Sequence, residues 1–175
     1  LFFNVLNLYL YCSLRFERIF PSVSMRIGGA PTSSLDSSST AQWKYDVFLI
    51  FRGIDTRRSF TDHLYAALKQ KGIFTFRDNE ELERGKYISM ELLKAIEESR
   101  FAIVIFSKNY AFLTWCLDEL AKIVKCMKEI GLTILPIFYD VDPCDLRKQM
   151  GTFGQAFNEH AERFKENMEK IETWR

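Results

Sequence analysis

Four apolar runs recur along the chain beyond residue 43. They occupy residues 45–51, 73–76, 101–106 and 132–138. Their starts lie 28, 28 and 31 residues apart, which is about the length of one strand–helix–strand unit. The last two runs are apolar almost throughout, as in strands that helices cover on both faces. The pattern therefore predicts four β-strands joined by helical crossovers.

Apolar residues recur at helical spacing between these runs. The stripes comprise Phe60, Leu64 and Leu68, then Ile88, Leu92 and Ile96, then Leu117, Leu120, Ala121, Val124 and Met127. Alternating strands and helices predict an α/β fold with a doubly wound parallel sheet and right-handed crossovers. In the flavodoxin-like order the first and third strands are neighbours, and ligands bind beyond their carboxyl ends. The loops at 51–57 and 107–114 would then lie side by side.

The segment before this pattern divides into two parts. Residues 1–27 start with an apolar run too short to cross a bilayer, and basic residues follow the run instead of preceding it as in a secretory signal. We interpret them as a non-native or upstream-translated extension, with an incomplete signal or an interfacial anchor as alternatives. Residues 28–42 are rich in serine and threonine, which is typical of a flexible linker. The folded domain is therefore expected at 43–175.

Composition and charge narrow the class of protein. The 175 residues suffice for one domain with a core, and 24 basic against 23 acidic residues give a net charge of +1. This balance argues against a protein whose main partner is a nucleic acid. The cysteines form no Cys-x-x-Cys pair and the two histidines are far apart. These spacings disfavour a metal site or a disulfide framework and favour a reduced, intracellular setting.

The loop after the first strand has the residues of an anion-binding turn. Arg52 and Arg57 supply positive charge, and Gly53 lets a backbone or ligand approach closely. Asp55 or Thr56 is expected to cap the helix that follows. An ordinary strand-to-helix turn with two solvated arginines fits the same residues, so the alternatives stay open here.

The helix after the third strand carries a second candidate feature. On a helical wheel, Trp115 and Glu119 lie one turn apart and nearly opposite the buried stripe that includes Leu117. An acid at that position is ordinarily solvated. Trp115 either packs against a neighbouring loop or offers a stacking face beside the carboxylate. Periodicity alone leaves both interpretations open.

Two other polar segments have ordinary explanations. The charged loop at 78–86 fits a mobile flap and a solvated connection equally well. Asp140, Asp142 and Asp145 follow the fourth strand beside a proline, and this pattern favours a capped turn over a metal site.

The sequence lacks the motifs of several familiar classes of α/β enzyme, and these classes are therefore excluded. The third strand runs into Ser107 and Lys108 and lacks the acid of a phospho-receiver. The sequence contains no P-loop, no G-x-G-x-x-G fingerprint and no G-x-S-x-G elbow.

Five linked stretches follow one another across residues 43–175. They are YDVFLIFRGIDTRRSFTDHLYAAL, GIFTFRDNEELERG, AIEESRFAIVIFSKNY, TWCLDEL and LPIFYDVDPCDLRKQMGTFGQAF. Together they closely resemble the Toll/interleukin-1 receptor (TIR) domain of plants, the N-terminal module of TIR-type nucleotide-binding, leucine-rich-repeat disease-resistance proteins. The resemblance implies a flavodoxin-like fold. It also implies a cytoplasmic or nuclear domain that self-associates and cleaves NAD⁺, and NADP⁺, at the nicotinamide–ribose bond to produce signals in plant defence.

The resemblance also assigns roles to residues. Glu119 is the essential acid, Trp115 lines the nucleotide site, and the Phe51–Arg57 loop lies beside the bound dinucleotide. Asp78 and Gly85 fall in a loop similar to the family's BB loop, through which a neighbouring protomer helps to close the site. NAD⁺ is the substrate here, and no cofactor or metal is implied.

The sequence departs from the family's usual residues in several places. Ile50 stands where serine is usual, and Ile54 replaces a commonly acidic residue. The other departures are at Asp62-His63, Asn79, Phe112, Leu113 and Cys144. The family's fifth strand and last helix are missing, so we expect a C-terminally truncated domain whose fourth strand has a bare edge. The Ile50 change and the missing C-terminal elements favour the alternative function, a catalytically silent adaptor or decoy that binds other TIR domains, whereas the presence of Glu119 and Trp115 favours the enzyme.

Overall fold

The computed structural model describes residues 43–77 and 90–174. The expectations for the extension at 1–27, for the linker at 28–42 and for Ile88 lie outside the described residues. No helix within the described part of the chain is long and apolar enough to cross a membrane.

The centre of the fold is a parallel sheet of four strands in the order β2-β1-β3-β4. The strands are β1 (Tyr45–Phe51), β2 (Thr75–Arg77), β3 (Ser99–Phe106) and β4 (Thr133–Phe138). This is the flavodoxin-like doubly wound order, so the predicted fold class is confirmed. β1 and β3 are neighbours along their whole length, from Tyr45 opposite Ser99 to Phe51 opposite Ile105. The carboxyl ends of β1 and β3 therefore lie next to each other, on the same side of the sheet as the ends of its other strands.

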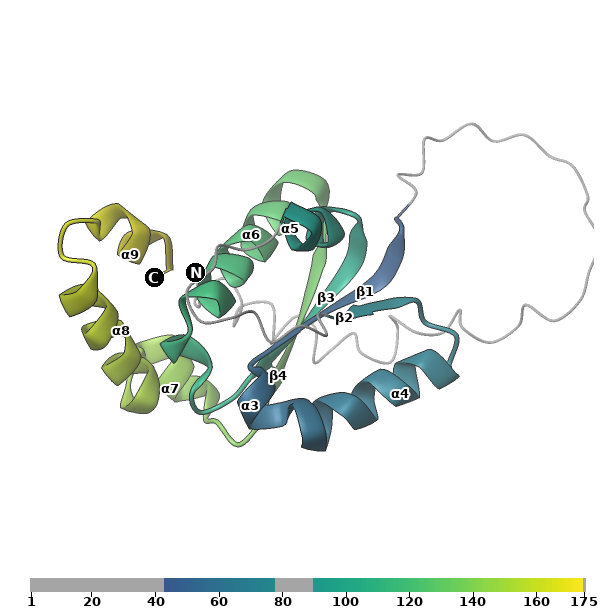
Figure 1. Cartoon of the computed structure of the whole chain (residues 1–175), viewed down its shortest axis with the longest axis horizontal. Helices are drawn as coiled ribbons and strands as arrows, with labels where there is room; N and C mark the ends of the chain where they lie inside the picture. Colours follow the sequence, from purple (N-terminus) through teal and green to yellow (C-terminus); the bar gives the residue numbers. More distant parts are fainter. Residues whose placement is uncertain (1–42, 78–89, 175) are drawn as a thin grey trace, which may run out of the picture.

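Helices cover both faces of the sheet (Figure 1). The helices are α3 (Gly53–Thr56), α4 (Asp62–Gln70), α5 (Met90–Glu97), α6 (Thr114–Ile130), α7 (Pro143–Lys148), α8 (Gly151–Arg163) and α9 (Met168–Trp174), with a π-helical turn η1 (Arg57–Thr61) and a 3-10 turn η2 (Tyr110–Phe112). Side chains of β1 alternate between the faces. Phe48 and Ile50 pack with α5 and α6, whereas Val47 and Leu49 pack with α4.

The second strand begins later than its apolar run predicts. Residues 73–76 were the expected strand, whereas β2 starts at Thr75. The backbone of Gly72 has a φ of 73° and turns the chain out of α4. The Ile73 N–H then donates to the Leu68 carbonyl at 3.0 Å, so it closes the helix and does not enter the sheet.

The turn after β4 is capped, as its aspartates indicate. Asp142 is the N-cap of α7, and its side chain accepts a 2.7 Å hydrogen bond from the Cys144 N–H. Among the described residues, no group of three or more histidine, cysteine, aspartate or glutamate side chains could hold a metal ion. β4 forms one edge of the described sheet.

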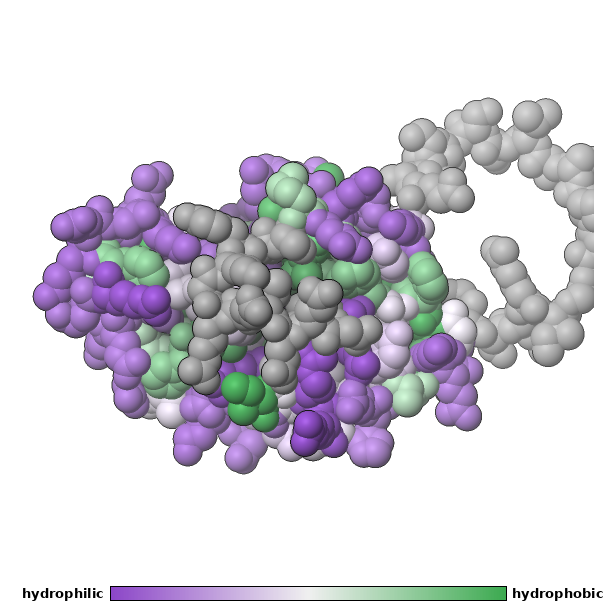
Figure 2. Space-filling model, in the orientation of Figure 1, coloured by the Kyte–Doolittle hydropathy of each residue, from purple (hydrophilic) through white to green (hydrophobic). Residues whose placement is uncertain are grey.

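The chain beyond β4 is mostly helical, and it returns to α6. Trp174 at the end of α9 is fully buried, and its Nε1 donates to Asp118 Oδ1 at 2.7 Å. His160 of α8 contacts the Trp174 ring edge-on, with 5.2 Å between ring centroids, and its Nε2 lies 2.8 Å from the Ala111 carbonyl oxygen. The outer surface of α8 and α9 is mostly hydrophilic (Figure 2). This helix pair therefore supports α6 and η2 from outside the sheet.

We expect Trp174 to be a main support of α6. Trp174→Ala removes a fully buried ring and leaves a cavity, so it should lower the free energy of unfolding by about 3–5 kcal/mol. Glu172→Ala, on the exposed side of the same helix, should change it by less than about 0.5 kcal/mol. Urea denaturation measures both variants. Equal losses of stability in the two variants would contradict the role of Trp174 as a support of α6.

Candidate functional site

The loops that follow β1 and β3 meet at Asp55. Ser107 Oγ donates to Asp55 Oδ2 at 2.6 Å, and the Asn109 N–H donates to the same oxygen at 3.3 Å. The Asn109 side-chain amide lies 3.5 Å from Oδ1, and the Arg52 guanidinium pairs with Oδ1. The predicted side-by-side placement of the two loops is therefore confirmed.

Neither candidate N-cap caps a helix, so that prediction is wrong. Arg52 occupies the N-cap position of α3 and makes no side-chain cap bond. Asp55 falls inside α3, and its carboxylate is directed across to the loop after β3. Thr56 Oγ1 donates to the Arg52 carbonyl at 3.4 Å and accepts from Thr61 Oγ1 at 2.8 Å. α3 begins before Asp55, which places this side chain beyond the capping position. Thr56 occupies the N-cap position of η1, but its side chain makes no cap hydrogen bond there.

The two arginines of this loop are not simply solvated. The Arg52 side chain is 16% exposed and is paired with Asp55, and its Nε is buried without a hydrogen-bond partner among the described residues. Such orphan donors are rare in protein interiors. The Arg57 guanidinium lies over the Phe51 ring, with Cζ 5.2 Å from the ring centroid. Both cations thus have fixed positions at the carboxyl end of β1.

Gly53 makes room for one of these cations. A Cβ at this position would lie 3.2 Å from Arg57 Nε and 3.3 Å from its Nη2. Real Cβ atoms seldom approach neighbours this closely. The close approach expected from the glycine is therefore made by a side chain of the chain itself.

Glu119 is buried despite its position on the helical wheel. It is 6% exposed, whereas an acid opposite the apolar stripe of α6 is ordinarily solvated. The helical wheel of α6 predicts burial only for the face that packs on the sheet. Tyr110 of η2 and Cys116 lie close enough to interact electrostatically with this carboxylate. Trp115 is half-buried and packs against the adjoining core.

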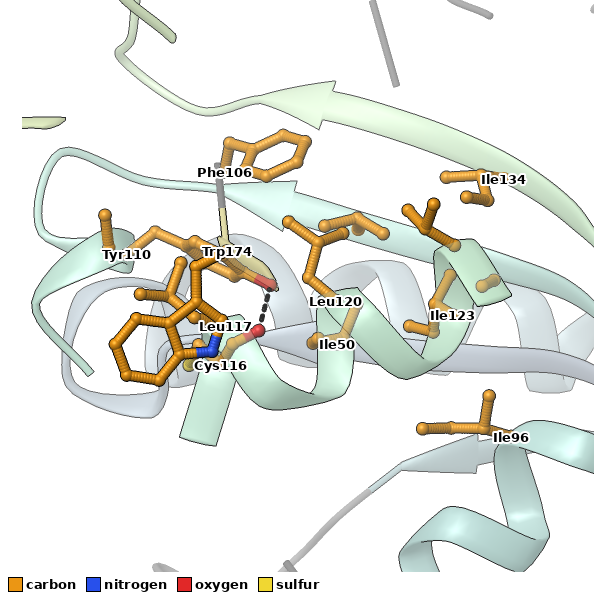
Figure 3. Close-up of a cluster of buried hydrophobic side chains, with 14 of the residues drawn as sticks. Ile50, Ile96, Phe106, Tyr110, Cys116, Leu117, Leu120, Ile123, Ile134 and Trp174 are labelled. Carbon is orange, nitrogen blue, oxygen red and sulfur yellow. Dashed lines mark hydrogen bonds between the residues drawn. The ribbon is translucent and has the colours of Figure 1, made fainter. Parts of the chain in front are cut away.

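Burial controls the ionisation of the groups around Glu119. The Tyr110 hydroxyl donates to the Cys116 carbonyl at 3.0 Å, and both residues are fully buried (Figure 3). Burial raises the pKa of both side chains well above its ordinary value, and the charge of Glu119 adds to each shift. At Cys116, Arg52 lowers the pKa and Asp55 raises it. Residues from both loops and from α6 therefore share one electrostatic environment.

The structure brings together most of the residues predicted for the site. The loop from Phe51 to Arg57 lies next to the segment that leads into α6. Asp78 and Gly85 lie outside the described residues. Sequence reasoning placed the loop at 107–114 beside this one but assigned no role to Ser107 or Asn109, although polar residues so soon after an apolar strand were a usable signal. The arrangement offers a buried carboxylate, an aromatic side chain and two fixed cations, which suits an anionic ligand with a cationic reacting centre.

Comparison with known proteins identifies the family of the chain. The family model described as TIR domain matches residues 44–175. The chain belongs to the TIR domain family. It is 55% identical over 139 residues to TMV resistance protein N of Nicotiana glutinosa, covering 79% of this chain and 12% of that protein. It is 54% identical over 153 residues to Disease resistance protein RPV1 of Vitis rotundifolia, covering 83% of this chain and 11% of that protein.

A solved structure supports the same assignment. The TIR domains of the activated Roq1 resistosome, which directly recognises the pathogen effector XopQ, match with a TM-score of 0.66 and 51% sequence identity. The match covers 74% of this chain and 81% of that chain. This TIR domain spans only about a tenth of the length of the curated relatives above.

The buried thiol and phenol predict a loss of stability at high pH. Unfolded cysteine ionises near its ordinary pKa of 9.0, whereas burial holds the pKa of Cys116 well above that value in the folded state. Above pH 9.0 the folded state thus retains a proton that the unfolded state loses. The free energy of unfolding should then fall by up to about 1.4 kcal/mol per pH unit, and Tyr110 should add to the fall above its own ordinary pKa.

Urea denaturation as a function of pH measures this slope. Cys116→Ala removes one of the ionising groups, so its stability should fall less steeply with pH than that of the wild type. An identical slope in the two proteins would contradict the assignment to Cys116.

Proposed function

We propose that this TIR domain cleaves NAD⁺, and NADP⁺, at the bond between nicotinamide and ribose and thereby signals in plant defence. The observation that carries the proposal is the buried carboxylate of Glu119, which lies one helical turn from Trp115 and shares an environment with Arg52. Burial of an acidic side chain is energetically costly, and such acids are often found where they have a function.

The chemistry requires one well-placed carboxylate. The nicotinamide of NAD⁺ is already cationic and leaves as a neutral molecule, so its departure needs no proton from a general acid. The ribose carbon acquires oxocarbenium character as the bond breaks. Glu119 stabilises this developing positive charge and accepts hydrogen bonds from ribose hydroxyls. A water molecule then adds to the ribose carbon and loses a proton.

The loop after β1 binds the rest of the substrate. Arg52 and Arg57 meet the pyrophosphate, and the orphan Nε of Arg52 supports this role because it offers a donor that no described residue uses. Phe51 fixes the Arg57 guanidinium from one side, and Trp115 stacks on the nucleotide. Gly53 and Thr56 shape the loop that carries these groups.

Assembly completes the site in this proposal. The loop with Asp78 and Gly85 closes the pocket of a neighbouring protomer, so activity depends on association with other TIR domains. The match to the TIR domains of an activated resistosome supports this view, as do relatives named as disease-resistance proteins. The proposed location is the cytoplasm or the nucleus. The second candidate, a silent adaptor or decoy, is favoured by Ile54, whose apolar side chain is 74% exposed within the loop after β1.

Replacing the acid tests the reaction. Glu119→Gln keeps the size of the side chain and removes its charge, so turnover of NAD⁺ should fall by at least about 10². The matched control is Glu129→Gln, because Glu129 lies on the same helix, is exposed and forms a surface ion pair with Lys125. NAD⁺ loss and nicotinamide release are measured with the full chain clustered on a surface.

The outcomes separate the two candidates. Equal rates in Glu119→Gln and wild type would refute the assignment of the acid. No cleavage by any variant, together with suppressed NAD⁺ loss in a mixture with an active TIR domain, would establish the decoy.

The glycine of the loop after β1 gives a second test. In Gly53→Ala the methyl group displaces the Arg57 guanidinium, whose side chain can move without unfolding the protein. Loss of one charge-assisted contact to the pyrophosphate should raise KM for NAD⁺ by about tenfold or more. The control is Arg57→Ala, in which adding Gly53→Ala should have no further effect. A further rise in KM in that background would show that Gly53 acts independently of Arg57.

A further inference from the structure

We propose that Asp55 is a positioning residue that locks the loop after β3 to the loop after β1 and makes no contact with substrate. This inference rests on the proposed function and deepens it. It differs from the role implied by the family resemblance, in which the whole loop from Phe51 to Arg57 lies against the dinucleotide.

The hydrogen-bonding capacity of Asp55 is already used. An ionised carboxylate offers about four acceptor positions. Ser107 Oγ and the Asn109 N–H occupy Oδ2, while Arg52 and the Asn109 side-chain amide occupy Oδ1. The side chain is only 11% exposed. A ribose hydroxyl could bind this carboxylate only by displacing one of these internal donors.

The contacts connect the two halves of the site. Ser107 and Asn109 open the segment that leads through η2 into α6, and the Tyr110 N–H donates to the Ser107 carbonyl at 3.0 Å. Fixing the start of this segment fixes the entry of α6, which carries Glu119. The same carboxylate also binds one end of the guanidinium of Arg52, which belongs to the loop after β1. Asp55 thereby sets the distance between the cation and the acid.

A planar guanidinium benefits from this arrangement. Carboxylate contact at one end orients the whole fork, so the remaining N–H groups point in a fixed direction. The charges of Arg52, Asp55 and Glu119 all act on the pKa of Cys116, so residues of both halves influence one buried side chain. Loss of Asp55 would leave Arg52 free to rotate and Ser107 without its 2.6 Å acceptor.

A double-mutant cycle tests the link between the loops. Kinetics of NAD⁺ cleavage are measured for Asp55→Ala, Ser107→Ala and the double variant of the full chain. We expect Asp55→Ala to lower kcat/KM by about tenfold or more and Ser107→Ala to lower it several-fold. The double variant should be no worse than Asp55→Ala within about twofold, because both changes break one lock. Multiplying losses would overturn the proposal.

Substrate analogues distinguish positioning from direct contact. Each analogue of NAD⁺ lacks one ribose hydroxyl. If Asp55 only positions other groups, the rate ratio of wild type to Asp55→Ala is the same for NAD⁺ and for every analogue. A ratio that collapses to one with a single analogue would show that Asp55 binds that hydroxyl. Asp55→Asn keeps one acceptor oxygen and the shape of the side chain. Its kcat should therefore lie between those of Asp55→Ala and wild type, with little change in KM.

Hydrogen exchange tests the role of Asp55 without relying on NAD⁺ cleavage, so it can fail or succeed independently of the proposed function. Amide hydrogen exchange at Asn109 should be faster in Asp55→Ala than in wild type, because its acceptor is lost. Asp62→Ala, at the more exposed aspartate that pairs with Arg77, should leave this exchange unchanged. If the wild type does not cleave NAD⁺, the proposed function fails and this comparison alone decides on the lock. Unchanged exchange at Asn109 in Asp55→Ala would overturn it.

Discussion

The parallel pairing of β1 with β3 is the contact on which the rest of this molecule depends. The crossovers that leave these strands go to opposite faces of the sheet, with α4 on one side and α6 on the other. The two loops therefore part as they leave the sheet, and polar side chains can converge between them. Both faces of β1 are buried, and a slip of one residue would exchange Phe48 and Ile50 with Val47 and Leu49 between the two apolar clusters.

The site places charge where the fold would otherwise place apolar groups. Glu119, Arg52 and Asp55 are largely removed from water, and an isolated charge in such a place is costly. Their mutual proximity and the donors from Ser107 and Asn109 offset part of that cost. The uninterrupted apolar core on both sides of the sheet supplies the remaining stability. Ile50 belongs to this core and is 1% exposed, so its departure from the family's serine adds apolar packing under the site.

The sequence was sufficient for the fold and insufficient for the details of the site. Strand spacing predicted the sheet, because apolar runs and crossover lengths are local properties. The contact of Asp55 with Ser107 joins residues 52 positions apart, and no local pattern encodes it. Capping rules placed Asp55 at a helix start, but the helix begins before it. The helical wheel of α6 counted only the surface that packs on the sheet, whereas Glu119, nearly opposite, is also buried.

The return of α9 to α6 has a consequence for biosynthesis. Asp118 is adjacent to the acid of the site, and its partner Trp174 is 56 residues further along the chain. On the ribosome, α6 is synthesised long before the indole that seats it emerges from the exit tunnel. The helix that carries Glu119 therefore stays incompletely packed until the chain has been synthesised beyond α9 and Trp174 has left the exit tunnel. Order of synthesis thus separates the appearance of Glu119 from the packing that holds its helix in place.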